Sequence, residues 1–164
     1  SWATEEAFIE FLAADMSAKL AAMPANTHVL FTAHSLPQRI IDAGDPYPSE
    51  LRSTAVAVAA KLGLEENTQW SIAWQSAGRT PEPWIGPDIL DVIDSLASQT
   101  TPAAGVLISA CGFVADHLEV LFDLDIEALH RAQQHGLAFA RTECVNDNGA
   151  IMNALAHRVH AANQ

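Results

Sequence analysis

Basic side chains are scarce in this sequence. Only 8 of its 164 residues are Lys or Arg, against 20 Asp and Glu, and the formal net charge is −12 at pH 7. Nucleic acids are bound chiefly through clustered Lys and Arg, so no nucleic acid is expected as a partner. An acidic surface of this kind instead raises the local concentration of small cations.

Cysteine and long apolar runs are scarce as well. The two cysteines, Cys111 and Cys144, fit neither a disulfide framework nor a zinc motif, so buried thiols are expected. No apolar run reaches the roughly 20 residues that span a bilayer, which predicts no integral membrane segment. A basic start followed by a short apolar stretch is also missing, so no secretory signal is visible and a cytoplasmic location is expected.

The residues that are present suit one globular domain. Hydrophobic residues make up 49% of the chain and charged ones 17%. Strand-like apolar runs alternate with segments of helical periodicity, and Gly or Pro marks the boundaries. The expected order is a helix from a Thr4 cap to Pro24, a strand over 28–33, a helix from about 48 to 63, a strand over 69–74, a helix from 87, a strand over 104–110, a helix from about 116 to 136, a strand over 137–141 and a helix over 149–160.

Strands that are joined through helices of this length run parallel. The pattern therefore predicts an α/β fold with a four-stranded parallel sheet and helices on both faces. In such open sheets, ligands bind beyond the carboxyl ends of the strands. His34 directly follows the first strand, Gln75 and Ser76 follow the second, and residues 111–120 follow the third. We expect these polar loops to converge.

A histidine at the end of a strand is often only a hydrogen-bonded structural residue. A ligand role for His34 is the alternative, and His117 competes with it on the same argument. Periodicity does not choose between the two histidines.

Three acids recur every four residues in the helix that follows the third strand: Glu119, Asp123 and Glu127. This spacing places them on one stripe, where like charges repel by a few tenths of a kcal/mol per pair. Either the stripe is a solvated face or it forms a cation path. One imidazole and one carboxylate from different loops suit a borderline divalent metal such as Fe²⁺.

Four motifs carry a resemblance to a known family: AHSLP at 33–37, GDPYP at 44–48, WQSAGRTPEPWIGPDI at 74–89 and GFVADHLEVLFDLDIEA at 112–128. In their order and spacing the chain resembles ferrochelatases, most closely the Gram-positive type that acts on coproporphyrin III. The resemblance covers only the C-terminal half of that family. It implies that residues 1–164 form a single C-terminal lobe of Rossmann-like, chelatase-like fold, and that the N-terminal lobe is absent from this chain.

The resemblance also implies roles for the acidic and histidine residues. His34 matches the family's active-site histidine and Glu119 its partner carboxylate, which makes both catalytic and metal-binding candidates. Asp123 and Glu127 match acids along an unwound helix that leads to the surface, where an outer divalent ion such as Mg²⁺ can sit. A π-type distortion is expected in this helix. Tyr47 and Trp84 are expected to shape a pocket rather than to carry chemistry.

The implied reaction is the insertion of Fe²⁺, as a substrate, into a porphyrin during heme biosynthesis. Coproporphyrin III is the first candidate for the porphyrin and protoporphyrin IX the second. An imidazole and a carboxylate can bind the metal or accept the two pyrrole protons, and sequence leaves these roles coupled. The missing lobe is the expected partner, and the lobe alone is expected to be inactive. Two distant cysteines cannot complete a [2Fe–2S] cluster, so none is expected in this chain.

Two other functions remain open. One is a cobalt or iron chelatase acting on sirohydrochlorin, although such chains lack the GDPYP and TPEPW motifs. The other is a non-catalytic module that binds a tetrapyrrole or serves as a scaffold.

Overall fold

A four-stranded sheet organises the chain. The computed structural model describes residues 1–163, and its sheet has the order β2-β1-β3-β4 with every neighbouring pair parallel. The strands are β1 (Thr27–His34), β2 (Trp70–Gln75), β3 (Gly105–Ser109) and β4 (Ala138–Arg141). The chain runs from β1 to β2 on one side and then places β3 and β4 on the other side. The strand order therefore reverses between β1 and β3, where a ligand crevice is expected at the carboxyl ends.

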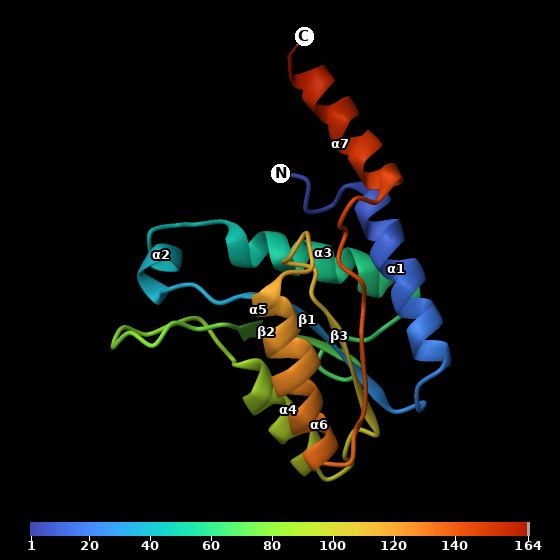
Figure 1. The fold of residues 1–164 in the computed structure, drawn as a ribbon, viewed down its shortest axis with the longest axis vertical. Coiled ribbons are helices and arrows are strands. Elements are labelled where there is room, and N and C mark those ends of the chain that lie inside the picture. The colour runs from blue at the N-terminus through green and yellow to red at the C-terminus, as the bar shows by residue number, and fades with distance from the viewer. Residues whose placement is uncertain (164) are drawn as a thin grey trace.

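Helices cover both faces of the sheet (Figure 1). Helices α1 (Glu6–Ala21), α3 (Tyr47–Leu62) and α7 (Gly149–Ala162) enclose one hydrophobic core with β1, centred on residues such as Leu12, Phe31 and Val58. The opposite core contains α4 (Ile89–Ser98), α5 (Leu118–Phe122), the π-helical turn η1 (Asp123–Ala128) and α6 (Leu129–Gln134). The predicted α/β class, with a parallel sheet covered on both faces, is confirmed.

Local capping follows the sequence in two places. Asp88 caps α4, because its side chain accepts a hydrogen bond from the backbone N–H of Leu90. Gly63 ends α3 in the left-handed region, with φ of 65°.

The predicted Thr4 cap is wrong. Glu5 occupies the N-cap position of α1, and its backbone carbonyl accepts from the N–H groups of Phe8 and Ile9. A turn in which the N–H of Glu5 bonds to the carbonyl of Trp2 delays the helix by one residue. The Glu5 side chain makes no cap bond and instead pairs with Arg158 at 2.9 Å.

Two other segments differ from the predicted boundaries. A short helix, α2 (Gln38–Asp42), follows the first strand and was not expected. The long helix that was expected from about residue 116 begins at Leu118 and is interrupted by η1. The expected π-type distortion is thereby confirmed.

Candidate functional site

The ring orientation of His34 follows from its place at the end of β1. Its Nδ1 lies 2.5 Å from the backbone oxygen of Ser35. A carbonyl oxygen only accepts hydrogen bonds, so Nδ1 carries a proton in this arrangement. The other ring nitrogen, Nε2, faces the Glu119 carboxylate, with 3.1 Å between Nε2 and Oε1.

Glu119 reaches His34 because the loop after β3 crosses closely over the end of β1. The N–H of Gly112 donates to the Thr32 carbonyl at 3.0 Å. A Cβ on Gly112 would lie only 2.2 Å from the Cβ of Ala33, so no larger residue fits there. The absence of a side chain at this one position allows the loop to bring Glu119 over the crevice.

The pair of His34 and Glu119 is suited to hold a positive charge. In neutral imidazole the lone pair of Nε2 points at a carboxylate oxygen, and two electron-rich atoms at 3.1 Å repel unless a proton or a metal ion lies between them. Both side chains are partly open to solvent, with 35% and 45% exposure. An incoming cation therefore has access to the pair.

His117, the competing histidine, lies elsewhere. It is exposed at the N-cap of α5, and its ring centroid is 5.5 Å from that of Phe113. Phe113 also lies 6.4 Å from the His34 ring, but only the His34 ring forms an ion pair with Glu119 among residues 1–163. The geometry therefore favours His34 as the imidazole that works with Glu119.

The remaining two acids of the stripe line a second feature. Asp123 Oδ2 contacts the hydroxyl of Ser76 and lies 3.5 Å from Nε2 of Gln75. Glu127 is exposed, and both acids line a pocket of about 260 Å³ beyond the end of β2. Asp123 and Glu127 are thus brought together, apart from the pair of His34 and Glu119. Within residues 1–163, no three His, Cys, Asp or Glu side chains lie close enough to hold a metal ion.

Sequence reasoning assigned no role in this pocket to Asp88 or to Gln75, although Gln75 was among the polar groups expected to converge. Asp88 was expected only at the start of a helix, yet it also lines the pocket, and burial raises the pKa of its carboxyl. Gln75 is 1% exposed, and its Oε1 has no hydrogen-bond partner among the described residues. The signal for Gln75 was its place at the carboxyl end of β2, among the polar groups expected to converge, and the signal for Asp88 was its place directly before α4.

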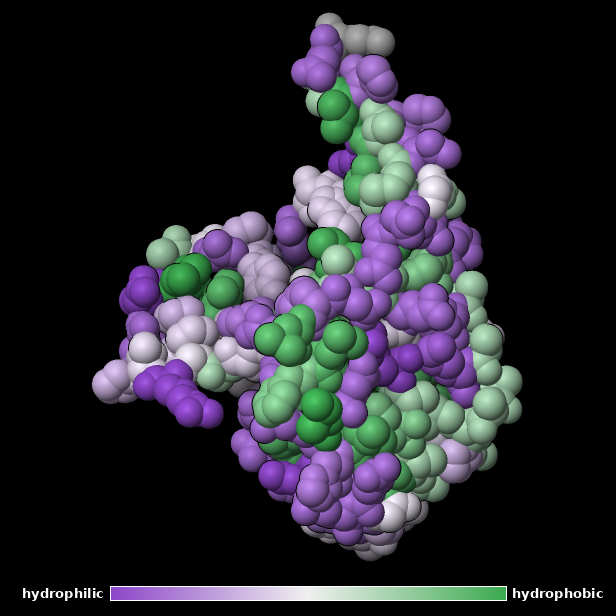
Figure 2. Space-filling view, in the orientation of Figure 1, coloured by the Kyte–Doolittle hydropathy of each residue, from purple (hydrophilic) through white to green (hydrophobic). Residues whose placement is uncertain are grey.

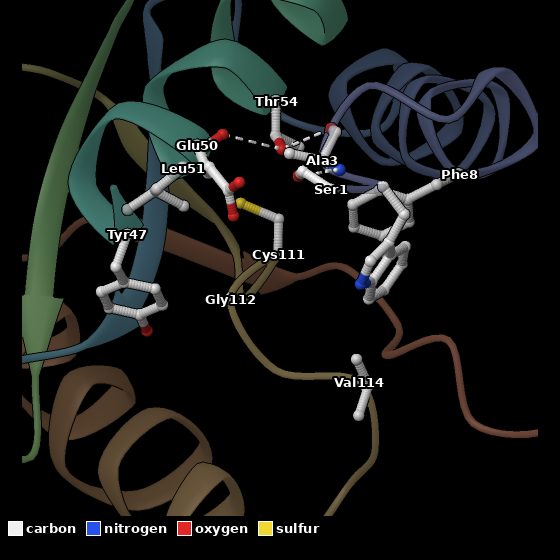
Figure 3. A pocket seen from close by; sticks show the side chains of 11 residues that line it. Ser1, Ala3, Phe8, Tyr47, Glu50, Leu51, Thr54, Cys111, Gly112 and Val114 are labelled. Carbon is white, nitrogen blue, oxygen red and sulfur yellow. Dashed lines mark hydrogen bonds between the residues drawn. The ribbon is translucent and has the colours of Figure 1, made fainter. Parts of the chain in front are cut away.

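A pocket of about 140 Å³, lined by apolar and polar side chains, lies beside the crevice (Figure 3). Figure 3 shows Tyr47 and Leu51 on one side of it, Phe8 on the other and Cys111 between them. Tyr47 shapes this pocket as expected, and burial raises the pKa of its phenol. His34 and Glu119 do not line the pocket, so it adjoins the charged pair without containing it.

Trp84, the other predicted shaping residue, packs within its own loop. Its Nε1 donates to the hydroxyl of Thr80 at 2.9 Å, and its ring covers Gly78, where an added Cβ would lie 2.3 Å from the indole. The loop is also tied to the segment after β1, because Gln38 N–H donates to the Pro83 carbonyl at 2.9 Å. Trp84 therefore stabilises the loop at the rim of the crevice and does not form the pocket wall that had been expected.

An open parallel sheet that carries a histidine–carboxylate pair where its strand order reverses defines an α/β lobe of the chelatase class. A family model described as Ferrochelatase matches residues 1–163. The chain belongs to the ferrochelatase family, which confirms the resemblance found in its motifs.

Several curated relatives are similar over nearly the whole chain. The chain is 43% identical to a ferrochelatase of Herpetosiphon aurantiacus, in a match that covers 94% of this chain and 50% of the relative. It is 41% identical to the coproporphyrin III ferrochelatase of Geobacillus kaustophilus, over 94% of this chain and 49% of that protein. A ferrochelatase of Deinococcus radiodurans is 41% identical over 93% of this chain. The chain spans about half the length of the curated relatives it matches.

Within residues 1–163, no helix has both the length and the apolar character that crossing a membrane requires.

Proposed function

We propose that this chain is the single C-terminal lobe of an enzyme that inserts Fe²⁺ into a porphyrin in heme biosynthesis. The observation that carries the proposal is the 3.1 Å approach of His34 Nε2 to Glu119 Oε1 at the point where the strand order reverses. Family membership supports the reaction type.

The pair supplies what the reaction demands of a protein. A free-base porphyrin releases two protons from its pyrrole nitrogens for each Fe²⁺ that it takes up, so total charge is conserved. With its Nδ1 proton held by Ser35, His34 offers one basic atom, Nε2, and Glu119 offers carboxylate oxygens. Each can accept a pyrrole proton or bind the metal before transfer, but Nε2 cannot do both at once. The two roles are therefore coupled in our proposal.

Coproporphyrin III is our proposed porphyrin, with protoporphyrin IX as the alternative. Several relatives, including that of Geobacillus kaustophilus, bear the name coproporphyrin III ferrochelatase. Coproporphyrin carries four propionates, which require cationic partners. Arg79 is the arginine without a carboxylate partner in residues 1–163, whereas the others form ion pairs with acids. We therefore expect most propionate contacts to come from the missing lobe.

An N-terminal lobe is the proposed partner of this chain. Its presence is supported by the length of the relatives, about twice that of the chain. Large apolar side chains on α5 and η1 are also left in solvent: Leu118 is 83% exposed, Phe122 47% and Ile126 56%. Figure 2 shows these segments as a green patch beside purple surface. A second lobe that closes the cleft would cover such side chains, and we propose that the isolated lobe is inactive without it.

Asp123 and Glu127 are proposed as an outer cation path. Two carboxylates with surrounding waters suit Mg²⁺, which keeps several of its waters when bound, and they would also attract Fe²⁺ on its way to His34 and Glu119. We propose no [2Fe–2S] cluster in this chain, because its only two cysteines are buried in different parts of the core. The expected cytoplasmic location stays a prediction.

Neither alternative function is favoured by a specific observation. The match of residues 1–163 to the ferrochelatase model speaks against a sirohydrochlorin chelatase. The other alternative, a non-catalytic module that binds a tetrapyrrole, applies to the isolated lobe and not to the whole enzyme. Titration with coproporphyrin III, followed by Fe²⁺ insertion assays with and without the remaining half, separates this module from the enzyme.

The decisive experiment is His34→Ala in the full-length protein. We expect insertion to be lost while the thermal melt stays close to that of the parent, because His34 lies at the open end of β1 and is partly exposed. His117→Ala is the matched control, since this exposed ring lies near Phe113 and forms no ion pair with Glu119 among residues 1–163. Near-normal turnover by a well-folded His34→Ala protein would rule out the proposed role.

A further inference from the structure

The π turn η1 is held from two sides by side chains at the ends of different strands. On one side, Asp123 contacts Ser76 and Gln75 at the end of β2. On the other side, Asp125 binds Arg141, the last residue of β4. Three acids alternate along this turn, and the middle one points away from the pocket that the outer two line.

Arg141 binds both carboxylate oxygens of Asp125 through one edge of its guanidinium. Nε donates to Oδ1 at 2.8 Å and Nη2 donates to Oδ2 at 3.0 Å. Nη1 donates to the Thr142 carbonyl at 3.1 Å and lies 3.1 Å from Asp116. The Arg141 side chain is only 14% exposed, so its position is fixed by packing as well as by charge. A planar, bidentate contact of this kind sets direction as well as distance, which lysine cannot reproduce.

Such a fixed contact matters in a π turn, because this conformation is rare and the α form of the surrounding helix is the common alternative. Relaxation would change the direction of every side chain in the turn. Leu124 and Ala128 are fully buried and hold one face of η1 on the core. Neither apolar side chain bonds to the acids of the turn. The bond from Arg141 to Asp125 constrains one of these acids directly.

We infer that Arg141 is a positioning residue for the cation path: by binding Asp125 it holds η1 in the conformation that presents Asp123 and Glu127 to the pocket beyond β2. This inference rests on the proposed function of those two acids. It assigns no contact with metal or porphyrin to Arg141 itself.

Arg141→Gln separates a positioning role from a purely electrostatic one, because the two predict opposite changes in Co²⁺ affinity. Arg141 is a cation among several acids, so by electrostatics alone its removal should strengthen the binding of another cation. If Arg141 positions the turn, its removal should instead weaken Co²⁺ binding, about tenfold as for other residues that orient metal ligands. Calorimetric titration with Co²⁺ measures the affinity, using full-length protein that carries His34→Ala throughout to reduce binding at the inner pair.

Asp125→Asn and Asp116→Asn form a matched pair of variants. Each removes one carboxylate charge beside the same guanidinium, but only Asp125 lies in the π turn. We expect weaker Co²⁺ binding for Asp125→Asn and nearly unchanged binding for Asp116→Asn. An equal loss of Co²⁺ affinity in both variants would show that only the removed charge matters, and it would overturn the inference.

Folding and the proposed path are checked separately. Circular dichroism melts identify any variant that fails to fold, and if Arg141→Gln fails, Arg141→Lys tests the same point with the charge retained. The double variant Asp123→Asn with Glu127→Gln tests the path itself. If this double variant binds Co²⁺ as the parent does, the proposed path is wrong. If it binds weakly while Arg141→Gln binds as well as or better than the parent, the path stands and the role of Arg141 is overturned.

Discussion

At the scale of single residues, the orientation of one imidazole determines which atoms are available for chemistry. Ser35 directly follows β1, and its backbone N–H donates to the Gln75 carbonyl at the end of β2, at 2.7 Å. Its carbonyl is thereby fixed beside Nδ1 of His34, 2.5 Å away. The protonated nitrogen thus faces the protein, and Nε2 is left for Glu119 and for a cation.

Glu119→Gln tests whether the pair needs its negative charge. The amide of Gln can donate a hydrogen bond to Nε2 of neutral His34, so the variant satisfies the imidazole without a proton or a metal ion. We expect an unchanged melting temperature but a loss of insertion activity of about a hundredfold or more, the usual range for a lost acid–base group. Insertion rates in the full-length protein measure this. A variant with normal activity would show that the carboxylate charge is not used.

At the scale of elements, the loop between β3 and α5 depends on one close backbone approach. Gly112 lies against Ala33 at the end of β1, and the added methyl of an alanine would meet the Ala33 Cα at 2.7 Å. The loop cannot move away freely, because its N–H bonds to the Thr32 carbonyl. This contact links the position of Glu119 to the end of β1.

Gly112→Ala should therefore separate Glu119 from His34. We expect a loss of about 1–3 kcal/mol in the free energy of unfolding, as for other overpacked sites, together with weaker Co²⁺ binding. Urea denaturation and calorimetric titration provide the two measurements. Gly149→Ala is the control, because a Cβ there has nothing within 4 Å and should leave both quantities nearly unchanged. Parent-like stability of Gly112→Ala would contradict the close approach.

At the scale of the whole molecule, stability should depend on pH through a buried histidine far from the site. His28 lies in β1, is 7% exposed and shares a 2.9 Å hydrogen bond with the Ser71 hydroxyl of β2. Burial lowers the pKa of His28 from its usual value of 6.5. Below pH 6.5, His28 therefore binds a proton more readily in the unfolded chain than in the folded one.

The free energy of unfolding is thus expected to fall as the pH drops below 6.5 toward the lowered pKa of His28. The slope from one such group is at most about 1.4 kcal/mol per pH unit. Urea denaturation at several pH values between 5 and 7.5 measures it. His28→Gln, which can keep a bond to Ser71, should flatten this dependence. Equal slopes in the two proteins would show that His28 takes up its proton without disturbing the fold.

Much of the fold and part of the site were predictable from sequence. Apolar periodicity and the Gly and Pro boundaries indicated each strand, because burial of neighbouring residues repeats at short range along the chain. The connection through helices then implied a parallel sheet, whose carboxyl ends bring His34 and the loop containing Glu119 to one edge. The spacing of Glu119, Asp123 and Glu127 indicated a shared helical stripe. Motif resemblance led to the ferrochelatase family.

Only the tertiary structure decided how these groups are used. It brought His34 rather than His117 to Glu119, placed Asp88 and Gln75 in the pocket with Asp123, and joined Arg141 to Asp125 across 16 positions. It also replaced the expected Thr4 cap by Glu5, because a turn at Trp2 shifts the start of α1. Sequence patterns record which residues are buried and which backbone bonds form nearby. Contacts between side chains from distant elements depend instead on how the helices and strands pack, which a local pattern does not contain.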